Sequence, residues 1–419
     1  MIIEFSVKNF RSIKDLQTIS FAATKMESNQ EKYGEVDKNN IVHIGDYRLL
    51  KTVGIYGANA SGKSNIIRAL SCFFEAVRSL PSPKSQLSKV ADPFLFQENA
   101  NGSESFFQMV FLLDGQKYRY GFTVKKNTDV DRQNSSEIIT SEWLYGPKEK
   151  NQVAYFIREG LSITKKNLPI EEKIPDLQFK HTLYLTHLAS FNKGFCYNIW
   201  ISLIRGLSNC DFGQEIYRGE SIRMLKDEES KKDLLHFLSN FNLDYSDIII
   251  DDNDLKDKLN VPQEKILLSK KYMPNLYLNL KENESEGTKK LFDIAGFLIL
   301  VLRPDVSCLI ILDELDSNFH PSLVIKIVEL FNNPKINKSN SQLLFSSHDT
   351  NLLSPALMRR DQFYFTEKTE DESTRLYSLA DLKGIRNDAD FAKQYLAGYY
   401  GAVPVLKDFT IDNTENNEQ

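Results

Sequence analysis

The chain has 419 residues, of which 41 % are hydrophobic and 11 % aromatic, so it can bury a large core and exceeds one ordinary domain. Its 52 basic and 57 acidic residues give a net charge of −5, which excludes a uniformly basic protein that coats nucleic acid. The four cysteines form no CxxC pair, which argues against a disulfide framework or a zinc site. Without a signal-peptide pattern or an apolar run of bilayer length, the sequence predicts a cytoplasmic protein with no membrane partner.

The first part of the chain has the pattern of strands, interrupted by one helix. Apolar and polar residues alternate in "IIEFSV" from Ile2, and "RLLKTVGIYG" from Arg48 predicts one further strand that runs into glycine. The segment "KSNIIRALSCFFEAV" after Gly62 has the apolar spacing of a helix. The segment "FFQMVFLLDGQKYRYGFTV" from Phe106 predicts a β-hairpin, because Asp-Gly suits the two positive φ angles of a type I′ turn. Another strand pair is expected in "SEWLYG" and "VAYFIREGLSIT".

A phosphate-binding motif lies between the predicted strand and the predicted helix. The segment "GANASGKS", which ends at Ser64, matches G-x-x-x-x-G-K-[ST]. In such a loop the backbone N–H groups surround phosphate, and the helix N-terminus adds its positive end. We expect Lys63 to reach the β- and γ-phosphates of ATP and Ser64 to hold Mg²⁺. The other nucleotide contacts predicted in this segment are Gly57, Asn59, Ala60, Ser61, Gly62 and Asn65.

From about Pro175 to Lys265 the chain changes to helical and polar segments, among them the amphipathic "SKKDLLHFLSNF". Sustained heptads are missing from this sequence, which argues against a long coiled-coil arm. Strand character returns in "NLYLNL", and "ESEGTKKL" then begins a helix at Ser285, with Gly287 close behind. Such a start offers a hydroxyl, free N–H groups and the helix dipole to an anion. Alone, the pattern fits an ordinary N-capped helix better.

Two further strands end in polar residues. The apolar run in "CLIILDELD" predicts a buried strand that carries Asp313 and Glu314 to its C-terminal edge. We expect Asp313 to hold Mg²⁺ through water and Glu314 to orient or deprotonate the attacking water. The strand in "LLFSSHDTNLL" ends at His348, which we expect to sense the γ-phosphate and to help position that water. Acidic strand ends and single structural histidines are common, so the interpretation depends on the position of these motifs relative to Lys63.

The order of phosphate loop, serine-glycine helix start, carboxylate pair and histidine resembles the ABC-type ATPase domain and its SMC-like relatives. The resemblance implies an α/β fold, with an ABC-type P-loop NTPase core, a β-hairpin lobe and an inserted, mainly helical subdomain. It implies an ATP sandwich of two subunits, in which Ser285 and Gly287 contact ATP held by the opposite subunit. Asp316 would lie in the loop that crosses to the partner. The segment "VKNFRS" resembles an SMC-like strand that helps to hold nucleotide, which implies Asn9 and Arg11; a surface pair at a strand end is the alternative.

The sequence departs from the L-S-G-G-Q signature of that family. Glu284, Glu286 and Thr288 stand where Leu, Gly and Gln are expected. The glutamine-bearing loop has two candidates, Gln97 and Gln108, and both have an ordinary structural place in or near the hairpin as the alternative. These departures affect how strongly the signature is expected to contact ATP on the opposite subunit. They do not affect the phosphate loop.

Segments at both ends of the chain resemble one clade, the ABC-like ATPases of bacterial anti-phage defence, which include abortive-infection pairs and PARIS-type systems. The segments are "MIIEFSVKNFRSIKDLQTISF", "IYGANASGKSN", "ESEGTKKLF", "LDELDSNFHP", "SSHDTNLL" and "YLAGYYGAVPVL". The resemblance implies an ATPase that senses a trigger and holds an effector protein. It also implies that the ATPase assembles as a dimer or a multiple of two. It also implies a separate effector protein, a small nuclease, and a phage protein or nucleic acid as the trigger.

An SMC-like DNA-repair or DNA-clamping ATPase is the second hypothesis, although such proteins need long coiled-coil arms or a hinge. A nuclease in the same chain is less favoured, because few residues follow His348 and the acidic run "IIIDDND" from Ile248 fits a solvated strand end. The long spacing from phosphate loop to signature and carboxylates argues against a transporter subunit and an AAA+ ring motor. The predicted regions are a first ATPase lobe at 1–170, a helical insertion at 171–265, a second ATPase lobe at 266–380 and a docked C-terminal segment with a frayed tail at 381–419.

Overall fold

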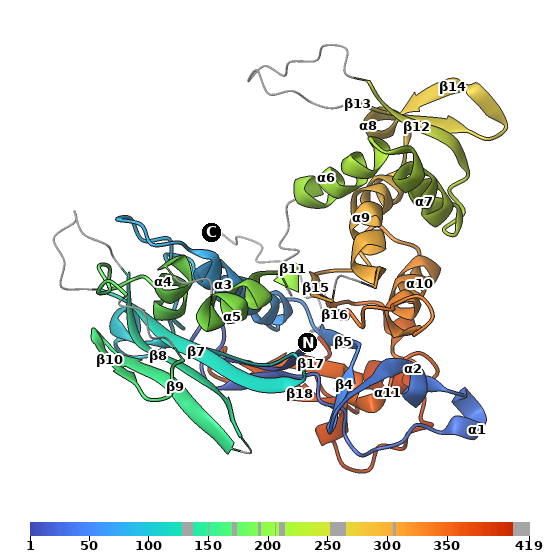
Figure 1. Ribbon diagram of the computed structural model, residues 1–419. Coiled ribbons are helices and arrows are strands. Elements are labelled where there is room, and N and C mark those ends of the chain that lie inside the picture. The colour runs from blue at the N-terminus through green and yellow to red at the C-terminus, as the bar shows by residue number, and fades with distance from the viewer. Residues whose placement is uncertain are drawn as a thin grey trace, which may run out of the picture.

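Two large sheets and a projecting arm make up most of the fold (Figure 1). The computed structural model describes residues 1–127, 137–149, 151–169, 174–191, 194–205, 207–208, 214–251, 265–304 and 307–404. The predicted frayed tail "DNTENNEQ" and residues 252–254 of the acidic run lie outside the described residues.

A six-stranded sheet in the order β11-β15-β16-β5-β17-β18 carries the phosphate loop. Its first five strands run parallel, and β18 pairs antiparallel with β17. The C-terminal ends of β5, β15 and β16 therefore meet at one edge, where α/β sheets bind ligands. The strands are β5 (Thr52–Gly57), β11 (Leu207–Ser208), β15 (Leu309–Leu312), β16 (Gln342–Ser346), β17 (Phe363–Lys368) and β18 (Thr374–Ser378).

The apolar run before Gly57 forms two strands, where the sequence predicted one. β4 pairs antiparallel with β3, whereas β5 joins the parallel sheet beside β16. Lys51 separates them: its N–H donates to the Asn40 carbonyl at 3.0 Å, and its carbonyl accepts from the Leu343 N–H at 2.7 Å. The hydrophobic pattern continues through this change of partner, so periodicity did not reveal it. The elements before β5 are α1 (Gln30–Tyr33), α2 (Val36–Asn40), β3 (Ile41–Ile44) and β4 (Tyr47–Leu50).

A seven-stranded antiparallel sheet, β10-β9-β8-β7-β6-β1-β2, forms the second layer. The predicted hairpin is confirmed, because Asp114 and Gly115 both have positive φ, 50° and 74°. Helix α3 (Lys63–Arg78) packs on this sheet through Phe73, whose ring lies 5.9 Å from Phe5 and 5.7 Å from Phe122. The strands are β1 (Ile2–Lys8), β2 (Gln17–Ser20), β6 (Ser105–Leu113), β7 (Gln116–Lys126), β8 (Glu137–Lys148), β9 (Asn151–Glu159) and β10 (Ser162–Lys165).

The helices of the predicted insertion divide between body and arm. Helices α4 and α5 share a hydrophobic cluster with the seven-stranded sheet, whereas α6 and α7 pack with α9 in a second cluster. The arm, defined as α6 to α9 with β12 to β14, projects from the body in Figure 1. The bounds are α4 (Tyr184–Phe191), α5 (Phe195–Arg205), α6 (Gln214–Leu225), α7 (Glu228–Ser239), β12 (Tyr245–Asp251), β13 (Lys265–Lys270), β14 (Met273–Asn279), α8 (Leu280–Asn283) and α9 (Glu286–Leu302).

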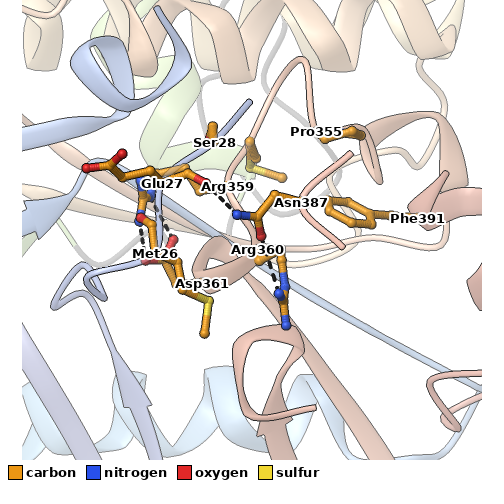
Figure 2. Close-up of a pocket in the computed structure, with 10 residues that line it drawn as sticks. Met26, Glu27, Ser28, Pro355, Arg359, Arg360, Asp361, Asn387 and Phe391 are labelled. Carbon is orange, nitrogen blue, oxygen red and sulfur yellow. Dashed lines mark hydrogen bonds and ion pairs between the residues drawn. The ribbon is translucent and has the colours of Figure 1, made fainter. Parts of the chain in front are cut away.

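The remaining helices, α10 (Pro321–Asn332) and α11 (Phe391–Leu396), pack in the second cluster. Figure 2 shows a pocket near the start of β17, where Arg360 donates to Asn387 and the Asn387 amide donates to the Glu27 carbonyl. Arg359 there donates to Asp361 at 2.8 Å. These polar groups bond to one another, and we assign this pocket a structural role.

Candidate nucleotide-binding site

The phosphate loop joins β5 to α3 with a backbone that requires glycine at two positions. Gly62, the residue before α3, has a φ of 107°, and a side chain there would run into Thr374 of β18. A Cβ at Gly57 would lie 2.6 Å from the Thr366 hydroxyl oxygen of β17. Ala60, between them, has a φ of 61°. The loop is therefore pressed against β17 and β18, which fixes its conformation.

Lys63 places its ammonium group inside this loop. The side chain is buried, and Nζ donates to the carbonyls of Gly57 at 2.8 Å and Ala58 at 3.0 Å. Burial lowers the pKa of Lys63, and the charges of the nearby carboxylates Asp313, Glu314 and Asp316 oppose that decrease. Ser64, one residue later, is exposed at the start of α3, as are Asn59 and Ala60 in the loop.

The side chains of Ser61 and Asn65, two of the predicted nucleotide contacts, form hydrogen bonds within the protein. The Ser61 hydroxyl lies 2.6 Å from the Thr366 hydroxyl. The Asn65 amide donates to the Ser12 hydroxyl at 2.7 Å, which brings the N-terminal segment beside the start of α3. These bonds explain why the two side chains suit the loop, and their contact with nucleotide stays a prediction.

Ser346, the last residue of β16, bonds to the Asp313 carboxylate and to the backbone of Glu314. Its hydroxyl donates to the Asp313 carboxylate and accepts from the Glu314 N–H at 2.8 Å. Its carbonyl accepts from the Leu315 N–H at 2.9 Å. Glu314 has a φ of 47°, which turns the chain sharply after β15. The sequence reasoning missed Ser346, although its place one strand over from the carboxylates follows once the order of strands is known.

His348 lies at the same edge as Lys63 and the carboxylates. Its backbone N–H is 3.3 Å from both carboxylate oxygens of Asp316. Burial lowers the pKa of His348, and the positive charge of Lys63 lowers it further, against the opposing charges of Asp316, Glu314 and Asp313. Both effects favour the neutral imidazole. The fold brings together five residues that were predicted separately from three segments.

The predicted signature begins α9, with Ser285 as the N-cap residue. Its exposed side chain accepts from the Thr288 N–H at 3.2 Å. A Cβ at Gly287 would lie 2.6 Å from the Asn318 carbonyl oxygen, so only glycine fits this contact without a shift. Lys290, which the sequence reasoning missed, donates to the carbonyls of Glu314 at 3.2 Å and Ser317 at 2.8 Å. The predicted signature helix thus holds the loop that carries Glu314.

The acidic residues of the signature are paired with lysines. Glu284 lies 3.0 Å from Lys270 of β13, and that ammonium stands 4.2 Å from the ring centroid of Tyr245. Glu286 pairs with Lys289 at 2.7 Å. The departures from the family signature therefore add no uncompensated negative charge beside Ser285.

The side chains of the N-terminal candidates, Asn9 and Arg11, are engaged by other groups of the protein. The Asn9 side chain donates to Ser103 at 2.8 Å and accepts from Gln97 at 2.6 Å, so its role in the structure is to hold the loop before β6. Arg11 is partly exposed and forms an ion pair with Asp92 at 3.1 Å. Gln108 lies in β6 and accepts from Trp143 at 3.2 Å, which gives it a structural place in the sheet.

One protein family matches residues 53–354 of the chain, and it is described as an AAA domain, putative AbiEii toxin, Type IV toxin-antitoxin system. The match extends from β5 past His348, so it includes the phosphate loop, the signature, the carboxylates and the histidine. A search of curated proteins gave no match. In the described part of the chain, the helices are too short or too polar to cross a bilayer. The match covers most of the chain, which therefore belongs to this family of AAA-type P-loop ATPase domains.

Proposed function

We propose that this protein hydrolyses ATP as a conformational switch, closes as a pair of copies around ATP, and controls a separate effector in abortive-infection defence. The single observation that supports hydrolysis best is the cluster of Lys63, Asp313, Glu314 and His348 at one edge of the parallel sheet. The family description supports the abortive-infection context.

The residues at this edge fit ATP and Mg²⁺ by their chemistry. The ammonium of Lys63 and the N–H groups at the start of α3 suit phosphate oxygens. The exposed hydroxyl of Ser64 and the carboxylate of Asp313 are the hard oxygen ligands that Mg²⁺ prefers. When bound, Mg²⁺ neutralises charge on the phosphates. Glu314 accepts the proton of the attacking water or orients it, and neutral His348 contributes a hydrogen bond near the γ-phosphate.

Closure as a pair would add Ser285 of a second copy. Ser285 is exposed, and the contacts of Gly287 and Lys290 join α9 to the loop that carries Glu314. We therefore expect a change at Ser285 to affect the position of Glu314, because α9 contacts the loop that carries Glu314. The proposed effector is a nuclease encoded separately, and a phage protein or nucleic acid is the proposed trigger.

Turnover of ATP by the wild type and two variants tests hydrolysis. Glu314→Gln should retain ATP binding but lose about a hundredfold in kcat, whereas Lys63→Ala should lose binding. Glu329→Gln, an exposed change on α10, is the matched control and should leave turnover unchanged. Wild-type turnover by Glu314→Gln would exclude Glu314 as the catalytic carboxylate.

A further inference from the structure

Tyr56, the residue before Gly57, carries a buried hydroxyl that the mechanism above does not use. Its ring packs among Phe345, Phe363 and Phe365, with centroids 6.4, 6.1 and 6.2 Å away. The side chain is fully buried, and within the described residues its hydroxyl has no hydrogen-bond partner. A phenylalanine would pack equally well among these rings, so packing alone does not explain the hydroxyl.

Asp349 supplies a complementary acceptor from the neighbouring loop. One carboxylate oxygen of Asp349 accepts from the backbone and side chain of Asn351, at 2.9 and 2.6 Å. The other oxygen is buried and lacks a partner among the described residues. Burial raises the pKa of Tyr56, and the charge of Asp349, followed by that of Asp316, raises it further. A buried donor and a buried acceptor thus lie within electrostatic reach of each other, and unsatisfied buried polar groups are rare.

These two residues lie next to two parts of the proposed site, the phosphate loop and His348. Tyr56 precedes the first glycine of the phosphate loop, and Asp349 follows His348 directly. Strand β5, which carries Tyr56, is also joined to the segment just before His348, because the Ser347 N–H donates to the Ile55 carbonyl at 3.1 Å. A bond between the Tyr56 hydroxyl and Asp349 would connect the phosphate loop to the histidine loop through the core.

We propose that Tyr56 is a positioning residue, whose hydroxyl donates to Asp349 when ATP is bound and thereby holds His348 in place for hydrolysis. This inference rests on the proposed ATPase function. Tyr56 touches neither phosphate nor water; it acts through Asp349 and the adjoining histidine. Nucleotide binding, which depends on Lys63 and the loop backbone, does not require the hydroxyl.

Tyr56→Phe removes only the hydroxyl and tests the proposal. We expect kcat for ATP to fall about tenfold, while KM and the Kd for a fluorescent ATP analogue stay within about twofold of wild type. Tyr217→Phe, which removes another buried hydroxyl without a partner among the described residues, is the matched control on α6 and should leave kcat unchanged. Asp349→Asn should lower kcat similarly, and the double variant should be no slower than either single variant.

The outcomes separate this proposal from the function on which it rests. If the wild type hydrolyses ATP no faster than Lys63→Ala, the ATPase function itself fails. If the wild type is faster than Glu314→Gln but Tyr56→Phe retains the wild-type kcat, only the role of Tyr56 fails. Equal losses for Tyr56→Phe and Tyr217→Phe, or losses that add in the double variant, would also overturn that role.

Discussion

The ammonium of Lys290 in α9 donates to the backbone carbonyl of Glu314 at 3.2 Å, so one side chain connects α9 to the loop that carries Glu314. The same group also bonds to the Leu315 and Ser317 carbonyls, and it stands 4.8 Å from the ring centroid of Phe319. Burial lowers the pKa of Lys290, and the nearby charges of Asp316 and Glu314 oppose this. These contacts join the loop after β15 to α9.

Replacing Lys290 should lower the turnover of ATP but leave nucleotide binding nearly unchanged. In Lys290→Met the apolar stem remains but the three carbonyls lose their donor, so Glu314 is no longer held in position. We expect kcat for ATP to fall about tenfold with little change in nucleotide Kd. Steady-state turnover and equilibrium binding measure the two effects. Lys326→Met removes an exposed lysine of α10 that pairs with Glu329, and turnover should survive it; equal losses in both variants would contradict the role of Lys290.

Gly287→Ala tests the contact between α9 and the same loop. The added Cβ would lie 2.6 Å from the Asn318 carbonyl oxygen, so the loop must shift, and kcat should fall while the helix remains formed. Gly219→Ala in α6 is the matched control, because nothing lies within 4 Å of its Cβ. That change should raise stability by about 0.5 to 1 kcal/mol, because alanine favours the helix. Thermal unfolding and turnover of both variants check the prediction, and unaltered turnover in Gly287→Ala would contradict it.

The buried ammonium of Lys51 should make the stability of the fold depend on pH. Its buried ammonium donates to the Asn332 carbonyl at 3.2 Å, and burial lowers its pKa to about 8. Between about pH 8 and 10 the unfolded chain holds a proton that the folded chain has lost, so this residue makes stability rise with pH. At pH 7 Lys51 is protonated in both the folded and the unfolded chain, and its buried charge destabilises the fold.

Lys51→Met should therefore raise the free energy of unfolding at pH 7 by about 1 to 3 kcal/mol. The difference between wild type and variant should shrink from pH 8 to pH 10, as denaturant unfolding at a series of pH values would show. Lys335→Met, which removes an exposed lysine, is the control and should change neither quantity. A difference independent of pH would mean that packing, not charge, is responsible.

The parts of the site that were predicted from sequence are those in which one short segment contains the chemistry. The loop around Lys63 and the strand end at Asp313 have local patterns, and the Asp114–Gly115 turn has a local backbone requirement. Ser346 and Lys290 have none, because their partners are carbonyls, a carboxylate and an N–H group on other segments. Their importance follows from the strand order, which no local pattern encodes.

The division of the middle helices has the same physical cause. An amphipathic helix buries its apolar face against whichever sheet is near, and its sequence does not say which one. Leu188 of α4 faces the seven-stranded sheet cluster, whereas Leu234 of α7 joins the cluster around α9. Asn9 is a further example, since the resemblance implied a nucleotide contact but not its hydrogen bond to Ser103.

The native mass of Glu314→Gln protein, with and without saturating ATP, tests the proposed closure most directly. We expect a monomer without ATP and a mass that doubles, or reaches a higher even multiple, with ATP. Adding Ser285→Arg to the same protein should prevent the increase, because the bulky exposed side chain would obstruct the proposed contact in trans. A mass that stays the same at saturating ATP, with binding verified in the same sample, would contradict the ATP-dependent pair.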